Sequence, residues 1–169
     1  MKTQLVVAVL VCVACGVRGA ESQAESPLGK LASLVGTWQS EGDMNHDGKS
    51  ESFNIAYKLT AGQSALVETL MAGTPQEMIT VYTRDKDDFV ATHYCMLRNQ
   101  PRMRAKDTLA DNKLAFEFVD ATGLASPNDA HMHSLAIEFT DNDHIVQTWS
   151  HYKDGKETGK VVFHLTRQK

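Results

Sequence analysis

The chain has 169 residues, of which 42% are hydrophobic, and it carries 17 basic against 21 acidic residues for a formal net charge of −4. This length supports one domain with a real core but not two ordinary ones. The acidic balance argues against binding to nucleic acid or to anionic lipid surfaces.

The N-terminal segment has the pattern of a secretory signal. Lys2 precedes an uninterrupted apolar run over residues 5–15, and Arg18 and a polar stretch follow. The run is too short for a membrane-spanning helix, which needs roughly 20 apolar residues. We therefore predict a signal peptide at residues 1–19, with cleavage possibly as late as residue 24, and a secreted or periplasmic protein without an integral membrane segment after cleavage.

A lipoprotein signal is the alternative for this segment, because Cys15 follows Ala14 and would be the acylated residue. Cys12 stands where such a signal has Leu or Val, which makes anchoring through Cys15 the less favoured prediction.

Processing after Gly19 changes both the charge and the cysteine count. It removes Lys2 and Arg18 but no acidic residue, so the charge becomes 15 minus 21, or −6. Of the three cysteines only Cys95 remains, which excludes an intramolecular disulfide. A lone thiol in an oxidising compartment is buried, acts as a ligand, or pairs with another chain.

A short helix and then strands are predicted along the mature chain. Ser26-Pro27 is typical of a helix start, and the helix should end near Leu34, before Gly36. Beyond it, apolar residues alternate with polar ones, as at Leu114, Phe116 and Phe118, which is the period of a half-buried strand. Ten strands are predicted near 37–42, 51–59, 64–71, 77–84, 89–97, 102–109, 113–120, 132–140, 144–151 and 157–167.

The strand order favours an all-β, up-and-down antiparallel barrel over residues 26–169. Turn-forming residues separate successive strands, Asp154-Gly155 most clearly, and no segment is long enough for a helical crossover. Closing the meander removes two exposed edges and leaves room for a small ligand. A two-sheet sandwich of the same strands, with no internal space, is the alternative.

The two ends of the predicted barrel resemble the calycin barrels, which include lipocalins, fatty-acid-binding proteins and nitrobindin-like haem barrels. Gly36-Thr37-Trp38 after a short helix resembles their opening, and residues 163–167 resemble their closing strand. The resemblance implies that Arg167 stacks on Trp38 and closes one barrel end. With ten strands and no C-terminal helix, the chain is closer to the fatty-acid-binding proteins and the nitrobindin-like barrels than to the lipocalins. Val162, however, stands where the haem ligand of nitrobindin would lie.

The mature chain is also similar to a secreted bacterial protein family without an assigned function. The motifs that carry this similarity are Thr92-His93-Tyr94-Cys95, Asn99-Gln100-Pro101-Arg102-Met103 and His131-Met132-His133. The similarity implies kinship and no activity.

The histidines are the residues most suggestive of a site. By alternation His93 and Cys95 share the apolar face of one strand, and His131 and His133 share the face of Leu135 on another. All four are predicted to point into the interior, where imidazole and thiolate would suit zinc or haem. The alternative is that they are buried residues with satisfied hydrogen bonds.

A cluster of positive charge lies near residues 98–104. At a barrel mouth Arg102 and Arg104 would bind a carboxylate or phosphate, and otherwise they are solvated arginines. Residues 121–131 form the longest turn region, which is either a lid or an ordinary loop.

We therefore predict an extracytoplasmic protein that binds a small, largely apolar ligand through His93, Cys95, Arg102, Arg104, His131 and His133. A metal- or haem-dependent enzyme using the same lumen is the alternative, and a filled barrel serving as an interaction module is a third possibility. No catalytic residue is assigned, since Cys95 and His93 match no cysteine-hydrolase pattern and the acidic residues cluster in turns. The oligomeric state stays open.

Overall fold

The computed structural model describes residues 28–43 and 48–169. The predicted signal peptide and the predicted helix start at Ser26-Pro27 lie outside the described residues. Within the described part no helix has the length and apolar character needed to cross a membrane.

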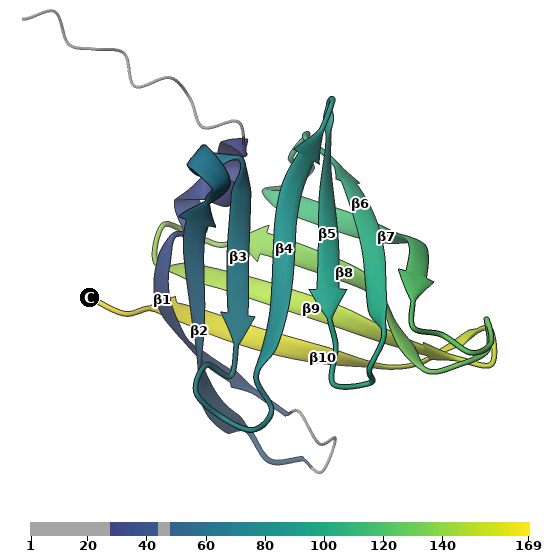
Figure 1. Ribbon diagram of the computed structural model, residues 1–169. Coiled ribbons are helices and arrows are strands. Elements are labelled where there is room, and N and C mark those ends of the chain that lie inside the picture. The colour runs from purple at the N-terminus through teal and green to yellow at the C-terminus, as the bar shows by residue number, and fades with distance from the viewer. Residues whose placement is uncertain (1–27, 44–47) are drawn as a thin grey trace, which may run out of the picture.

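Ten antiparallel strands close into a barrel in which each strand pairs with its neighbours along the chain and β1 pairs with β10 (Figure 1). The closure confirms the predicted ten-stranded barrel and excludes the sandwich. A 3₁₀ helix η1 (Gly29–Leu34) precedes the strands, and a 3₁₀ turn η2 (Ala61–Gln63) joins the second and third of them. The strands are β1 (Gly36–Gly42), β2 (Glu51–Thr60), β3 (Ala65–Leu70), β4 (Met78–Asp85), β5 (Asp88–Tyr94), β6 (Gln100–Lys106), β7 (Lys113–Thr122), β8 (His131–Phe139), β9 (His144–Lys153) and β10 (Lys156–Arg167).

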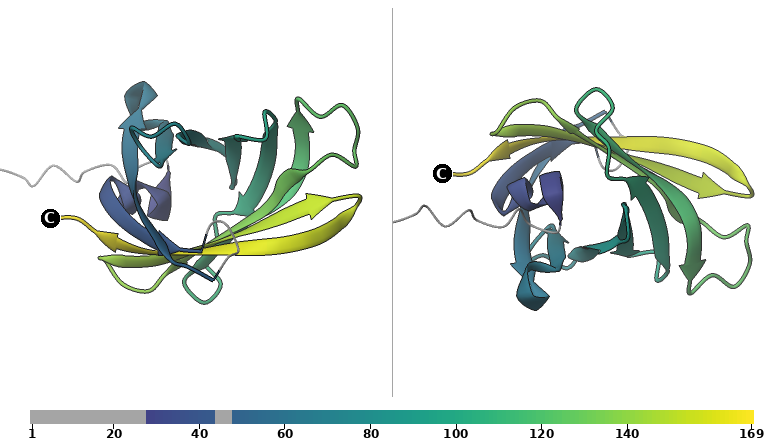
Figure 2. Two further views of the ribbon diagram at one scale, coloured as in Figure 1. Left: turned by 90° about the horizontal axis from the view of Figure 1, so that it is seen from below. Right: turned by 90° about the horizontal axis from the view of Figure 1, so that it is seen from above.

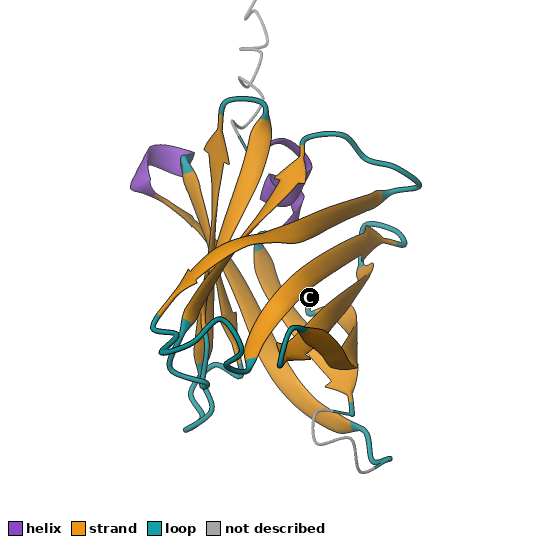
Figure 3. Ribbon diagram, turned by 90° about the vertical axis from the view of Figure 1, so that its right-hand side faces the viewer, coloured by secondary structure: helices purple, strands orange, loops and turns teal. Residues whose placement is uncertain are grey.

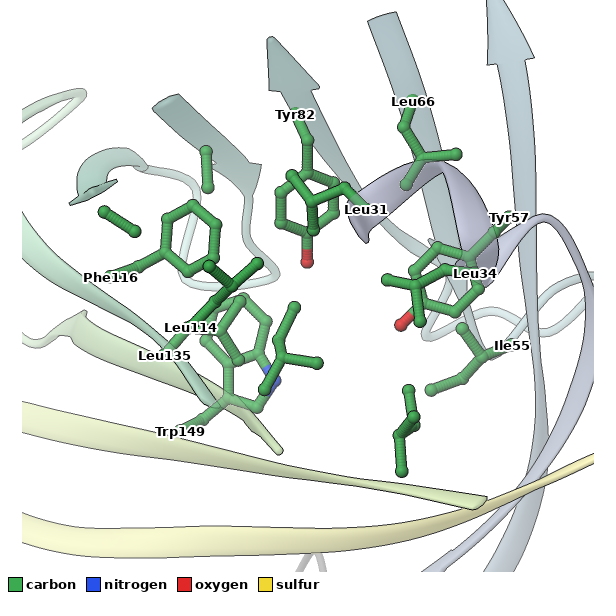
Figure 4. Close-up of a cluster of buried hydrophobic side chains, with 14 of the residues drawn as sticks. Leu31, Leu34, Ile55, Tyr57, Leu66, Tyr82, Leu114, Phe116, Leu135 and Trp149 are labelled. Atoms are coloured by element: carbon green, nitrogen blue, oxygen red, sulfur yellow. The ribbon is translucent and has the colours of Figure 1, made fainter. Parts of the chain in front are cut away.

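Alternation along each strand produces the barrel interior. In β5, Phe89, Ala91 and His93 are buried while the residues between them are partly exposed. Large side chains from many strands meet in the middle, where Figure 4 shows buried aromatic and aliphatic groups that come from different strands and from η1. Burial of this much apolar surface is the main stabilising contribution to the fold.

One end of the barrel is capped by η1, which lies inside the ring of strands when the barrel is viewed along its axis (Figure 2). Leu28, Leu31 and Leu34 are almost completely buried. The predicted helix is therefore present and ends at Leu34 as expected, but its turns are 3₁₀ rather than α. A short 3₁₀ segment suits a cap of two turns.

Trp38 and Arg167 complete this cap. The Arg167 guanidinium lies 4.1 Å from the Trp38 ring centroid, and it donates hydrogen bonds to the carbonyl oxygens of Val35 at 2.8 Å and Ser33 at 2.7 Å. The Trp38 indole N–H donates to the carbonyl of Leu34 at 2.8 Å. This is the arrangement that the calycin resemblance implied, and it ties the last strand to η1 and β1.

β7 and β8 diverge in the part of the wall that is remote from η1, where each of them carries a β-bulge. The two strands pair only from Lys113–Glu138 to Glu117–Ser134. Beyond that point Val119 is an extra residue in β7 relative to β6, and His133 is an extra residue in β8 relative to β9. Bulges increase local twist and turn side chains to new directions, and the strands are strongly tilted across this side of the barrel (Figure 3). We call the gap between the diverging strands the β7–β8 fork.

Candidate functional site: the interior cavity

A cavity of about 190 Å³ lies inside the barrel at the end opposite η1. The turn between β5 and β6 forms part of its rim, at the lower end of the barrel in Figure 1. Its wall is almost entirely apolar, and among the lining residues in the described part of the chain His93, Cys95, Trp149 and His151 have side chains with a nitrogen atom or a thiol. The lining residues are Leu70, Met78, His93, Cys95, Met96, Leu97, Met132, Trp149, His151, Val161 and Phe163.

His93 lies at the polar point of this wall. It is 2% exposed, and its Nδ1 atom is 2.9 Å from the hydroxyl oxygen of Thr80. Its ring packs 4.8 Å from the ring of Trp149. In the described part of the chain no hydrogen bond is made by its other nitrogen, Nε2. The prediction that His93 faces the interior is confirmed.

Burial decides the charge of this histidine. Desolvation lowers the pKa of His93 to about 4, because an imidazolium loses its hydration inside the barrel. The ring is therefore neutral at physiological pH, with one nitrogen as donor and the other as acceptor.

Cys95 also lines the cavity, in agreement with the prediction that it points into the interior, and it is half-buried. Burial raises the pKa of the Cys95 thiol, although hydrogen bonds with the backbone of Leu97 and Met96 oppose this. A protonated thiol is a poor nucleophile and a poor metal ligand. Cys95 therefore acts as part of the cavity wall.

A buried carboxylate lies behind the cavity, which the sequence analysis missed. Glu68 is fully buried. It accepts hydrogen bonds from the hydroxyls of Tyr57 and Tyr82, both at 2.7 Å, and from the side-chain amide of Gln147 at 2.6 Å. Figure 4 shows both tyrosine hydroxyls pointing into the interior. The sequence signal was present, since Glu68 stands between Leu66 and Leu70 on an apolar strand face.

This carboxylate is connected to both sides of the interior. The Gln147 amide also donates to the Tyr57 hydroxyl at 2.6 Å, and its oxygen accepts from the indole N–H of Trp149 at 3.2 Å. On the other side Thr80, which pairs with Glu68 across β3 and β4, has its hydroxyl oxygen 2.9 Å from Nδ1 of His93. We call this set, Tyr57, Glu68, Thr80, Tyr82, His93, Gln147 and Trp149, the buried network.

Burial and hydrogen bonding have opposite effects on the pKa of Glu68. Desolvation raises the pKa of Glu68, while the hydrogen bonds from Tyr57, Tyr82 and Gln147 lower it. Burial and the neighbouring Glu68 raise the pKa of both tyrosines well above its usual value, so both hydroxyls keep their protons. Three hydrogen-bond donors, which reach both oxygens of one carboxyl group, are the kind of arrangement that a buried acidic group requires.

His131 and His133 do not line this cavity, and the prediction that they do is wrong. In β8 it is Met132 that reaches the cavity, opposite His151 of β9. His131 is opposite Tyr152, which points to the other face of the sheet, and the bulge turns His133 the same way. Uninterrupted alternation from Leu135 gave the wrong face because a bulge adds one residue to the count.

The two histidines lie instead in the β7–β8 fork. His133 is sandwiched between near-parallel rings, with centroids 3.7 Å from Tyr152 and 4.6 Å from Phe118. His131 Nε2 is 3.1 Å from His133 Nδ1, and His131 Nδ1 is 2.8 Å from the carbonyl oxygen of Asp129. Residues 124–127, in the loop between β7 and β8, complete the hollow around this stack of rings. The loop therefore covers the fork and not the interior cavity.

Arg102 and Arg104 are not at the cavity either, which corrects the prediction of an anion clamp at the barrel mouth. Both lie on the outer face of β6, because Pro101, Met103 and Ala105 take the inward positions. Arg102 pairs with Asp120, and Arg104 is 2.7 Å from Asp85 and 3.3 Å from Asp88. Their charges are satisfied within the outer wall.

The predicted metal or haem site does not fit this geometry. The four predicted ligands are split between two faces of the wall, and residues 28–43 and 48–169 contain no group of three His, Cys, Asp or Glu side chains placed to hold a metal ion. The cavity is also smaller than the roughly 300–1,000 Å³ of pockets for drug-sized ligands, and a haem is larger than such ligands.

Comparisons of the chain with known proteins identify related structures only at the level of the fold. No protein-family model and no curated protein matches the chain. Among solved structures it is similar to Rv2717c from M. tuberculosis, with a TM-score of 0.57 and 12% identity over 82% of this chain and 95% of that one. It is also similar to a DUF3598-family protein of unknown function from Nostoc punctiforme, with a TM-score of 0.55 and 13% identity over 85% of this chain and 51% of the other. These similarities show a shared barrel fold.

Proposed function

We propose that the chain is a binding protein that holds a small, largely apolar molecule in its interior cavity. The observation that carries this proposal is the cavity itself, about 190 Å³ with an apolar wall and one buried histidine. An apolar protein cavity of about 150 Å³ stays dry and binds benzene or xenon. The cavity therefore suits a ligand of one or two small rings or a short chain.

The calycin resemblance supports this proposal. Barrels of that kind hold ligands in the lumen, and this chain has the Trp38–Arg167 stack at one end and the cavity at the other. A barrel with a sealed base and an accessible far end is suited to ligand entry from one side.

The site of action that we propose is outside the cytoplasm. The apolar run at residues 5–15 and the single cysteine after processing support it. Expression of the full chain in a bacterial host, followed by fractionation and N-terminal sequencing, tests it. A mature N-terminus between residues 20 and 25 in the extracytoplasmic fraction is expected, and an uncleaved cytoplasmic chain would contradict it.

Binding of the hydrocarbon indene tests the proposed function. We expect the wild-type protein to bind indene in isothermal titration calorimetry. Val161→Phe, which fills the cavity wall of β10, should abolish binding. Val162→Phe is the matched control, because Val162 is the next residue of the same strand and is 39% exposed.

Equal binding to Val161→Phe and wild type would place the ligand elsewhere and refute the proposal. The same would follow if wild type bound no indene and protein purified from its own host released no small molecule on organic extraction, as measured by mass spectrometry. A Soret band in that native preparation would instead support the haem-dependent alternative.

A further inference from the structure

A second hollow lies in the β7–β8 fork. Its volume is about 640 Å³, which is within the range of pockets that bind small molecules. Among the described residues, none lines both this hollow and the interior cavity. The loop between β7 and β8 forms part of its wall, on the side of the barrel away from η1 (Figure 2). The fork is therefore a separate candidate for a binding site.

The loop that forms this wall is held in place by hydrogen bonds. The Asp129 carboxylate accepts from the backbone N–H groups of Ala125 at 2.8 Å and Ser126 at 3.0 Å. The side-chain amide of Asn99, in the turn between β5 and β6, donates to the carbonyl oxygen of Ala130 at 2.9 Å. The hollow is therefore preformed, as small-molecule sites usually are.

The contacts of His131 fix the positions of two protons in the histidine pair. His131 Nδ1 is 2.8 Å from the carbonyl oxygen of Asp129, and a carbonyl oxygen only accepts, so Nδ1 carries a proton. His131 Nε2 is 3.1 Å from His133 Nδ1. One proton lies between these two nitrogen atoms, because two facing lone pairs or two facing protons would repel each other.

The neutral pair therefore presents an acceptor to the hollow. Two neutral imidazoles carry two protons in total, and both are already placed, so Nε2 of His133 has a lone pair and no proton. Phe118 and Tyr152 cover the two faces of the His133 ring. The ring thus meets the hollow at its edge, where Nδ1 is turned to His131 and Nε2 is the nitrogen that a ligand can reach.

The surroundings of His133 keep this acceptor available at neutral pH. Burial and the neighbouring His131 lower the pKa of His133, whereas Glu117 of β7 and Glu157 of β10 oppose this shift. Glu157 is itself 3.5 Å from Lys160. Since the pKa is lowered overall, Nε2 is unprotonated at neutral pH and gains a proton only in more acidic solution.

The rest of the wall suits a largely apolar ligand. Val119, Leu124 and Pro127 line the hollow beside the ring stack, and Val119 is 50% exposed. Asp120 also lines it, but its carboxylate forms an ion pair with Arg102. The wall therefore combines apolar surface with one hydrogen-bond acceptor at His133.

We infer that the β7–β8 fork is a second ligand site, which takes a small, largely apolar molecule with one N–H or O–H donor that bonds to Nε2 of His133. Phenols and N–H heterocycles belong to this class. Binding is linked to protons, because a proton on Nε2 changes the acceptor into a donor and removes the hydrogen bond to the ligand. The ligand is therefore released as the pH falls.

Two probes of the same ring size and shape test the site. Indole carries an N–H donor, and benzofuran carries an acceptor oxygen in its place. Amide chemical shifts in NMR titrations separate the two hollows, because Ala125 lines the fork and Leu70 lines the interior cavity. At neutral pH we expect indole to shift the Ala125 amide with an affinity about two- to tenfold higher than that of benzofuran, which is the range of one net hydrogen bond.

The protonation state is measured on the same protein. Long-range ¹H–¹⁵N spectra of histidine-labelled wild type should show the His133 proton on Nδ1 at neutral pH and a second proton arriving on Nε2 as the pH falls. The preference for indole at Ala125 should disappear below the midpoint of that titration.

Two histidine variants connect the preference to one nitrogen atom. His133→Phe keeps a ring between Phe118 and Tyr152 but removes the acceptor, so indole and benzofuran should then bind the fork equally. His164→Phe is the matched control, because His164 is exposed on the outer face of β10. It should keep the wild-type preference. The spectra of wild type apply even if His133→Phe does not fold.

The outcomes distinguish this site from the interior cavity. If neither probe shifts the Ala125 amide, if benzofuran binds there as tightly as indole, or if the His133 proton is on Nε2 at neutral pH, the inference is wrong. None of these results bears on the interior cavity, which is tested separately by indene binding and by the Leu70 amide.

Discussion

At one end of the barrel Leu31 and Leu34 of η1 pack between the strands, and Arg167 lies over Trp38. At the other end the same strands enclose a cavity beside His93. The capped end therefore has side chains from a separate helix to fill it, and the hollow end has none. In a barrel with a fixed number of strands, whether one end is a packed core or a binding site depends on whether side chains from outside the strands fill the lumen there.

The largest difference between the two ends should appear when side chains are truncated. Leu34→Ala should lower the free energy of unfolding by about 2–5 kcal/mol, because it leaves a cavity in packed surroundings. Met96→Ala at the cavity rim should change it by less than about 0.5 kcal/mol, because Met96 is 55% exposed. Urea denaturation measures both, and similar losses would show that the two ends are equally well packed.

Acidification should act on the hollow end through His93. Its pKa is about 4 in the fold against 6.5 for the free side chain. The stability that it contributes is therefore present above pH 6.5 and lost as the pH falls through 4, an amount of about 3 kcal/mol.

Comparison with His93→Gln isolates this contribution. Glu68 has the opposite sign, because its raised pKa adds stability at low pH that is lost as the pH rises, and it is present in both proteins. Wild type should lose about 3 kcal/mol more than His93→Gln between pH 7 and pH 4, as measured by urea denaturation. Parallel pH profiles would show that His93 is hydrated.

Enlarging side chains should distinguish the ends in the opposite way. Leu34→Phe should destabilise the capped end by about 1–3 kcal/mol, because its surroundings are filled. Leu70→Phe should be nearly neutral, because Leu70 lines the cavity, and it should weaken indene binding. If Leu70→Phe is the more destabilising of the two, the hollow is not available for a larger side chain.

The smallest expected difference concerns two arginines. Arg167→Ala should cost about 1–2 kcal/mol, because it removes the contact with Trp38 and the hydrogen bonds to η1. Arg102→Ala should have no measurable effect on thermal unfolding, because its ion pair with Asp120 is exposed. Equal shifts in Tm would contradict a stabilising role for the cap.

Strand alternation predicted the fold because the side chains of a half-buried strand point to the core and to the solvent in turn, with a period of two residues. It placed all ten strands and assigned His93 and Cys95 to the interior. It failed at His133, where a bulge shifts the count by one and is not visible in the residue pattern. Arg102 and Arg104 were misassigned because the strand begins earlier than expected, at Gln100.

The buried network was missed for a different reason. Polar residues on apolar strand faces, such as Glu68 and Gln147, are visible in the sequence, but their partners come from strands far apart in the chain. Only the closed barrel brings Tyr57 within 2.6 Å of Gln147, which is 90 residues away. Hydrogen-bond partners at such separations follow from register and closure, and these are properties of the whole sheet.

The central claim, that one end of the barrel is hollow, is tested most directly by a crystal structure under xenon pressure. Xenon occupies apolar cavities of this size. The account predicts strong xenon density between His93, Trp149 and Val161, and none within the packed layer of Leu31 and Leu34. Side chains filling the space beside His93, with no xenon bound there, would contradict it.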